Sequence, residues 1–224
     1  MTFSLVARCA DTGMFGMAIS SSSPAVAARC AFTRAGVGAV ATQNITDPSL
    51  GPLTLDLLQK GLSANEVINE LNRTQAHMQF RQVLAVDNNG LSALHSGSSS
   101  LGIWTDAKAE NVAAGGNLLA KEEVVHTLVD NFINSEGHLG DRLIAAMKSG
   151  LASGGEAGPL HSAGMQIADK VSWPVADLRC DWTDQCPIEN IALAWEIYKP
   201  QLGSYIQRAL DPSESPSYGV PGDL

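Results

Sequence analysis

The chain has 224 residues and a net charge of −9, and 45% of its residues are hydrophobic while 17% are charged. This composition supplies a large core and argues against an intrinsically disordered chain. The acidic balance and the lack of a Lys/Arg cluster argue against nucleic-acid binding, and no apolar run reaches membrane-spanning length. With no basic segment and apolar stretch of the kind found in signal peptides, we expect a cytoplasmic protein with no membrane partner.

The first half of the chain alternates between strand and helix patterns. Period-two alternation of β-rich residues predicts strands, and apolar residues three and four apart predict helices. Ser63 and Glu66 have the spacing of a capping box, which marks the start of a helix. The predicted elements are strands at 3–9, 16–20, 35–42, 81–86 and 91–96 and helices at 50–60 and 64–73.

The second half opens with a short strand and a helix pair. The strand predicted at 111–114 ends in Gly115-Gly116-Asn117, which also fits a turn that closes the strand before a helix. The last helix carries an apolar seam from Ile188 to Tyr205, and Pro200 should kink it. The seam fits a helix packed on its own sheet or a subunit contact, and from it we expect a homo-oligomer. The other predicted elements are helices at 124–133 and 139–147, strands at 162–167 and 175–181, and the last helix at 187–210.

This order of elements predicts the fold class. Each helix pair has a single apolar face, so each pair can cover a sheet only from outside. Two sheets must then bury their inner faces against each other, which gives an α/β (α+β) fold in the form of a four-layer α/β/β/α sandwich. We expect one domain over residues 1–211 and a loosely held, Pro/Ser/Gly-rich tail over 212–224.

Motifs for metals and cofactors are missing from the sequence. The cysteines lack the CxxC pattern, so we interpret them as packed thiols rather than metal ligands. No HExxH or related spacing occurs, and Gly36 and Gly38 lack the third glycine of a dinucleotide fingerprint. We therefore expect neither a metal site nor a cofactor.

Thr2 places a hydroxyl group at the start of the first predicted strand. If Met1 is removed, Thr2 has a free α-amine, and such amines have a pKa of about 7.7 to 8.0. An amine beside the hydroxyl of its own residue can accept the hydroxyl proton and activate the oxygen as a nucleophile. While Met1 remains attached, the Thr2 nitrogen is an amide and cannot act as a base.

Four segments resemble a bacterial family catalogued as domain of unknown function 1028 (DUF1028), and the similarity runs from Thr2 to about Tyr198. The order of elements resembles that of the N-terminal nucleophile (Ntn) hydrolases, the superfamily of the proteasome β subunit. The resemblance implies hydrolysis of a small-molecule amide through an acyl-enzyme on Thr2. The segments that carry it are 2–8, 35–43, 116–119 and 177–179.

The resemblance also requires an oxyanion hole. Backbone N–H groups at Gly115 and Gly116 and the side-chain amide of Asn117 are the candidate donors, although these residues also fit a simple turn. Further residues are candidates for contacts with the substrate. They are Ser22, Gln43, His95 and Ser162.

The chain departs from the superfamily at Ser22, where many relatives carry Lys or His. A cation there would favour the neutral amine, whereas the serines at 20–23 supply only hydroxyl groups. Arg8, Arg29 or Arg81 could supply the missing charge from elsewhere. The alternative function is a non-catalytic binding or assembly protein that retains the scaffold.

A conventional nucleophile–base pair is a further alternative. His95 precedes a serine at the end of a predicted strand, and His161 precedes Ser162 at the start of another. Either pair could activate a serine, but the sequence lacks a GxSxG nucleophile elbow.

Overall fold

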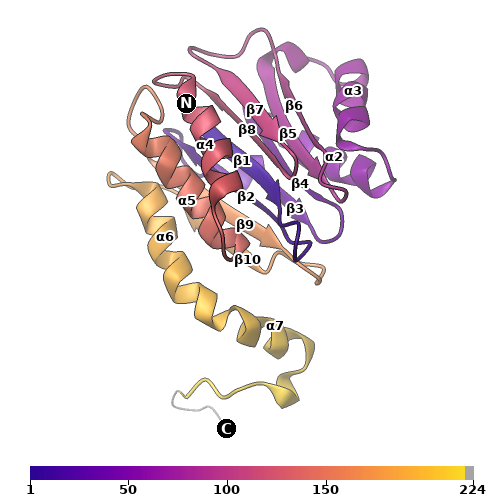
Figure 1. Cartoon of the computed structure of the whole chain (residues 1–224), viewed down its shortest axis with the longest axis vertical. Helices are drawn as coiled ribbons and strands as arrows, with labels where there is room; N and C mark the ends of the chain where they lie inside the picture. Colours follow the sequence, from indigo (N-terminus) through magenta and orange to yellow (C-terminus); the bar gives the residue numbers. More distant parts are fainter. Residues whose placement is uncertain (220–224) are drawn as a thin grey trace.

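The computed structural model describes residues 1–219, whose strands form two antiparallel sheets (Figure 1). The larger sheet has the order β10-β9-β2-β1-β8-β7, and the smaller has the order β3-β4-β5-β6. The larger sheet consists of β1 (Thr2–Arg8), β2 (Phe15–Ser21), β7 (Thr105–Ala109), β8 (Val112–Asn117), β9 (Ser162–Ala168) and β10 (Ala176–Cys180). The smaller consists of β3 (Ala31–Arg34), β4 (Gly38–Asn44), β5 (Arg81–Asp87) and β6 (Ser92–Ser96).

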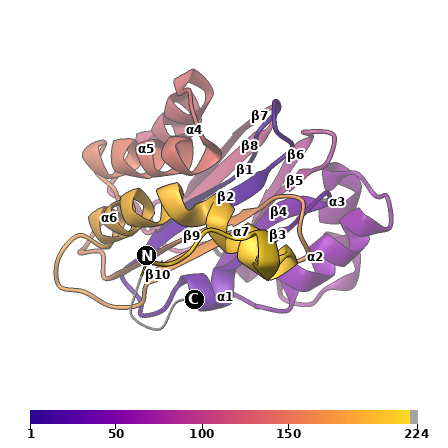
Figure 2. The same cartoon turned by 90° about the horizontal axis from the view of Figure 1, so that it is seen from below.

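Helices cover the outer face of each sheet, as Figure 2 shows for α4 and α5 on one side and α2 and α3 on the other. The larger sheet packs against α4 (Glu123–Asn134), α5 (Leu139–Ala152) and α6 (Pro187–Tyr198). The smaller packs against α2 (Leu50–Gln59) and α3 (Ala64–Thr74). The four-layer sandwich predicted from the sequence is confirmed. The remaining helices are α1 (Ala27–Cys30), α7 (Leu202–Leu210), η1 (Met78–Phe80), η2 (Lys199–Gln201) and η3 (Pro212–Glu214).

The central strand β1 divides its side chains between two layers of the core. Phe3 and Leu5 pack toward the helices, whereas Val6 packs between the sheets with Ile19 and Leu84. Because side chains two apart share a face of a strand, Thr2 and Ser4 lie on the same face as Val6. The start of β1 therefore places two hydroxyl groups at one end of the space between the sheets.

The structure corrects the predicted end of β8. Gly115, Gly116 and Asn117 continue the strand, and Gly116 is paired with Phe3 of β1 and Thr105 of β7. Glycine suits this position because a Cβ on Gly116 would lie 2.7 Å from Cδ2 of Leu119. The alternative of a turn is wrong because strand pairing outweighs the turn preference of a Gly-Gly pair.

Two edge strands were not predicted from the sequence. β3 has only four residues, and β7 is a half-exposed strand of mixed polarity. The strand predicted at 35–42 is β4, which begins at Gly38 because residues before it form the β3–β4 turn. The capping box at Ser63 and Glu66 is confirmed.

The C-terminal helix is interrupted at Pro200, as predicted, where η2 separates α6 from α7. Trp195 is 1% exposed and packs α6 onto the domain, whereas α7 has no buried residue and extends away from the sandwich (Figure 1). Described tail residues fold back onto α7, where Arg208 Nη2 donates a 2.9 Å hydrogen bond to the Pro216 carbonyl oxygen. The domain boundary at residue 211 stays a prediction, and residues 220–224 of the predicted tail lie outside the described part.

Among residues 1–219, no helix combines the length and the apolar character needed to cross a membrane.

Candidate active site

Thr2 is a buried residue of the larger sheet, with 6% of its surface exposed. It is paired with Ser21 of β2 on one side and with Asn117 of β8 on the other. Its Oγ1 atom lies 3.2 Å from Oγ of Ser21 and donates a 2.5 Å hydrogen bond to the carbonyl oxygen of Met1. The hydroxyl proposed as nucleophile is therefore fixed by its neighbours.

Hydroxyl groups surround the carbonyl group that precedes Thr2. Ser21 Oγ lies 2.6 Å from the Met1 carbonyl oxygen and 2.8 Å from Ser23 Oγ. The Ser23 backbone N–H donates to Ser21 Oγ at 3.1 Å. These neutral groups hold the end of the chain in place without a charged side chain.

Glu156 is a site residue that the sequence analysis missed. It lies in the loop between α5 and β9, is 6% exposed, and its Oε2 atom accepts a 3.0 Å hydrogen bond from the Ser22 backbone N–H. Its Oε1 atom is buried and has no hydrogen-bond partner. Burial raises the pKa of Glu156 to about 8, while the charged amino terminus and the bond from Ser22 act in the opposite direction.

A network of neutral side chains lies next to Thr2 in the space between the sheets. Ser4 Oγ donates to Gln43 Oε1 at 2.6 Å, and Gln43 Nε2 donates to Gln82 Oε1 at 3.2 Å. Gln82 Oε1 also accepts from Asn117 Nδ2 at 3.0 Å. Gln82 Nε2 donates to Ser96 Oγ and to the Gly116 carbonyl oxygen, both at 3.0 Å.

Gln82 was also missed by the sequence analysis, although it joins this network together. The only available signal was its position in β5, two residues before the buried Leu84. Because side chains two apart share a face, Gln82 had to point between the sheets. A buried polar residue at such a position needs hydrogen-bond partners.

The structure places Asn117 beside Thr2 as its register partner, and Gln82 joins Asn117 to Gly116 and Gln43 by hydrogen bonds. Asn117 is 2% exposed, and its Nδ2 atom carries a second N–H group besides the one donated to Gln82. Gly115 and Gly116 lie inside β8 with strands on both sides, where the ladder uses backbone N–H groups. The Asn117 side chain is therefore a better candidate oxyanion donor than either glycine.

The other predicted contact residues are placed differently. Ser22 touches Glu156 through its backbone, and Ser162 Oγ donates a 2.6 Å bond to the Ser23 carbonyl oxygen, which fixes the loop after β2. His95 lies away from Thr2, because it faces the helix layer, where Nε2 lies 2.8 Å from the Met78 carbonyl oxygen.

None of the three candidate arginines forms a hydrogen bond with Thr2 among residues 1–219. Arg8 lies at the far end of β1, and Arg29 Nη1 donates to the Pro24 carbonyl oxygen at 2.7 Å. Arg81 donates to the Ile45 carbonyl oxygen. The part of the chain that the structure describes also has no group of three or more His, Cys, Asp or Glu side chains placed to hold a metal ion.

The layers and the placement of Thr2 define the class of fold, a four-layer α/β/β/α sandwich with a buried hydroxyl residue at the start of a central strand. Residues 2–191 match the family of unknown function DUF1028, and the chain belongs to this family.

Solved structures resemble the chain to different degrees. A crystal structure from Silicibacter pomeroyi, assigned to DUF1028, has 25% sequence identity and a TM-score of 0.82, covering 88% of this chain and 89% of that one. Anbu (ancestral beta-subunit) from Yersinia bercovieri has 12% identity and a TM-score of 0.40, covering 92% and 97%. Anbu from Hyphomicrobium sp. strain MC1 has 9% identity and a TM-score of 0.37, covering 92% and 98%. No curated protein matches the sequence.

Proposed function

We propose that this chain is a cytoplasmic amidohydrolase that cleaves a small-molecule amide, with Thr2 as the nucleophile once Met1 is removed. The observation that carries the proposal is the environment of the Thr2 hydroxyl. It is buried at the start of a central strand, with Ser21 and Asn117 as its register partners. A free amine at this position would be an intraresidue base for that hydroxyl.

Thr2 supplies both the attacking atom and the proton carrier in this reaction. The α-amine accepts the hydroxyl proton as Oγ1 attacks the amide carbonyl carbon, which gives a tetrahedral intermediate with a negative oxygen. The ammonium group then protonates the leaving nitrogen, the C–N bond breaks, and the acyl group remains on Oγ1 as an ester. Water attacks this ester, the amine accepts the proton of the water, and Oγ1 regains a proton as the acid leaves.

Asn117 would stabilise the negative oxygen of the intermediate. One N–H group of its Nδ2 atom is fixed on Gln82, which orients the carboxamide, and the second is available to the substrate. Removal of an oxyanion donor typically lowers kcat by about a hundred- to a thousandfold.

Glu156 would control the charge near the amine. With its pKa raised to about 8 by burial, most Glu156 carboxyl groups are neutral at pH 7. This pKa belongs to the chain that retains Met1, whose amine is the charged neighbour of Glu156. Beside the Thr2 amine of the processed chain, a neutral Glu156 would not hold that amine in its protonated form, so the amine could act as a base without the Lys or His that many relatives carry at the position of Ser22.

The test is turnover of a panel of small amides, ureido compounds and N-acylated amino acids by protein shown by intact mass to lack Met1. We expect Thr2→Ala to abolish turnover and Thr2→Ser to retain part of it, because only the latter keeps a hydroxyl group. Thr127→Ala is the control, because the hydroxyl of Thr127 bonds to the Glu123 carbonyl oxygen and to Ser153 and not to Thr2. A genuine substrate that Thr2→Ala cleaves at the wild-type rate would remove Thr2 from the mechanism.

The second candidate is a non-catalytic protein built on the same scaffold. The contacts of the Met1 carbonyl oxygen favour it, since the Thr2 and Ser21 hydroxyls lie 2.5 and 2.6 Å away and hold the unprocessed chain. Intact mass of protein from its native host distinguishes the two, because a fully Met-bearing population cannot use the Thr2 amine as a base.

A further inference from the structure

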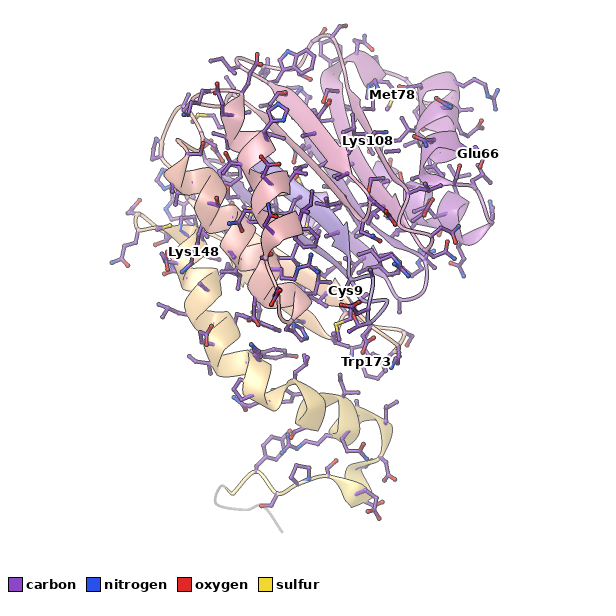
Figure 3. The ribbon with its side chains drawn as sticks, in the orientation of Figure 1. Cys9, Glu66, Met78, Lys108, Lys148 and Trp173 are labelled. Carbon is purple, nitrogen blue, oxygen red and sulfur yellow. The ribbon has the colours of Figure 1, made fainter. Side chains whose placement is uncertain are left out.

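A pocket of about 510 Å³ lies at the opposite end of β1 from Thr2. It is formed by the end of β1, the β7–β8 turn, the α4–α5 loop and the first turns of α5. Figure 3 shows Cys9, the residue after β1, at the end of the sandwich away from the N-terminus marked in Figure 1. Thr2 and Arg8 are six positions apart along β1, a span of about 20 Å, so the two sites are distinct.

Charged side chains of both signs line this pocket. Two are arginines, Arg8 and Arg142, and three are acids, Asp11, Glu110 and Glu136. None of the five takes part in an ion pair within the described residues, although other arginines, such as those at 34, 73 and 179, do. In a chain of net charge −9, unpaired arginines beside unpaired acids are unexpected.

Neutral neighbours hold both guanidinium groups in place. Arg8 Nη1 donates a 3.2 Å hydrogen bond to Asn111 Oδ1. Arg142 Nη2 donates to the Phe132 carbonyl oxygen at 3.0 Å, and the Arg142 guanidinium lies 4.1 Å from the centre of the Phe132 ring. The Nε atom of Arg142 is buried and has no partner. Because a guanidinium group has five N–H donors, both arginines keep donors for a ligand.

The mixture of charges selects the kind of ligand. A dianion would meet repulsion from the three acids, and a diamine would meet repulsion from the two arginines. A molecule with one carboxylate and one ammonium group can satisfy both sets, with the carboxylate bound by guanidinium groups in the manner that they favour. Ile133, which is 49% exposed, adds an apolar surface to the same pocket.

We propose that this pocket is a binding site for a zwitterion, an α-amino acid with an apolar side chain. The carboxylate of the ligand pairs with Arg8 and Arg142, and its ammonium group pairs with the acids on the pocket lining. Binding here is independent of hydrolysis at Thr2.

The test is calorimetric titration of the full chain with L-leucine, N-acetyl-leucine and leucinamide. Leucine should bind, and loss of either ligand charge should weaken binding by about tenfold or more, which is at least about 1.4 kcal/mol. Glutarate and putrescine test the dianion and the dication. Tighter binding of either one than of leucine, or no binding of leucine at all, would overturn the proposal.

Substitutions of residues that line the pocket test where leucine binds. Arg8→Gln and Glu136→Gln should each weaken leucine binding by about tenfold, whereas Arg34→Gln, whose guanidinium is paired with Asp56, should not. The Thr2→Ala variant should bind leucine like the wild type. Unchanged binding in both Arg8→Gln and Glu136→Gln would contradict the assignment, and circular dichroism of each variant excludes unfolding as the cause of a loss.

Discussion

The polar residues at the two ends of β1 have opposite environments. At the Thr2 end, neutral side chains are buried and joined by hydrogen bonds, with Gln82 bonded to four partners. At the Arg8 end, charged side chains surround an open pocket without pairing with one another. The polar groups at the Thr2 end are therefore used up in internal hydrogen bonds and sensitive to substitution, whereas those at the Arg8 end keep their hydrogen-bonding capacity for a ligand.

The largest expected loss of stability comes from Gln82→Ala. The substitution leaves partners of Gln82 unsatisfied in a buried space, and each unsatisfied group costs about 1–3 kcal/mol. We therefore expect the free energy of unfolding to fall by about 3–5 kcal/mol in urea titrations. The exposed Gln79→Ala should change it by less than about 0.5 kcal/mol. Equal effects of the two substitutions would show that the network adds nothing to stability.

The second prediction concerns pH and Glu156. The folded-state pKa of about 8 lies above the ordinary value of 4.5, so the folded chain keeps a proton that the unfolded chain releases. The contribution of this proton to the free energy of unfolding is present in full below about pH 4.5 and is lost as the pH rises to about 8. In Glu156→Gln the free energy of unfolding should fall less over this pH range than in the wild type, by on the order of a few kcal/mol.

The control for this prediction is the exposed Glu196→Gln, which should leave the pH dependence of the unfolding free energy as in the wild type. A wild-type stability that rises between pH 4.5 and 8 in step with that of Glu156→Gln would contradict the raised pKa.

The third prediction tests how closely the chain packs beside Thr2. In Gly116→Ala, the new Cβ would lie 2.7 Å from Leu119 Cδ2, which forces a repacking cost of about 1–3 kcal/mol. Gly203→Ala in α7 meets no atom within 4 Å and should stabilise the protein by about 0.5–1 kcal/mol. Thermal unfolding of both variants measures the two changes in stability. Melting temperatures that shift in the same direction in both would contradict the close packing at Gly116.

The smallest expected change is at the charged end of β1. Arg8→Gln removes a half-buried guanidinium that has no ion pair among residues 1–219, so the free energy of unfolding should change by no more than about 1 kcal/mol. Chemical denaturation measures this value. A loss as large as that of Gln82→Ala would make Arg8 a structural residue rather than a ligand-binding one.

Sequence reasoning predicted the layers because each depends on local periodicity. The apolar faces of the helices and the alternation in β1, β2 and β5 are visible in the chain. It missed β7 because the residues of that edge strand are half exposed, and the only apolar residues in its alternation are the small Ala107 and Ala109. It also ended β8 too early. Whether two consecutive glycines form a turn or continue a strand depends on the neighbouring strands, which are distant in sequence.

The site was predicted in part for the same reason. Thr2 and Asn117 stand at ends of strands that pair with each other, and the packing of the two sheets adds Gln43 through its hydrogen bond with Ser4. Glu156 and Gln82 were missed because burial, not residue type, gives them their roles. His95 was expected near the substrate. Because neighbouring residues of a strand point to opposite faces, His95 lies on the other face of β6 from Ser96 and points toward η1.

The most direct test of the central claim is to trap the acyl group. Protein lacking Met1 is incubated with a reactive ester or β-lactone, and the modified peptide is identified by mass spectrometry. The account predicts one acyl group on the Thr2 hydroxyl, absent from Thr2→Ala and retained in Thr127→Ala. An acyl group carried by another residue, with Thr2 unmodified, would contradict it.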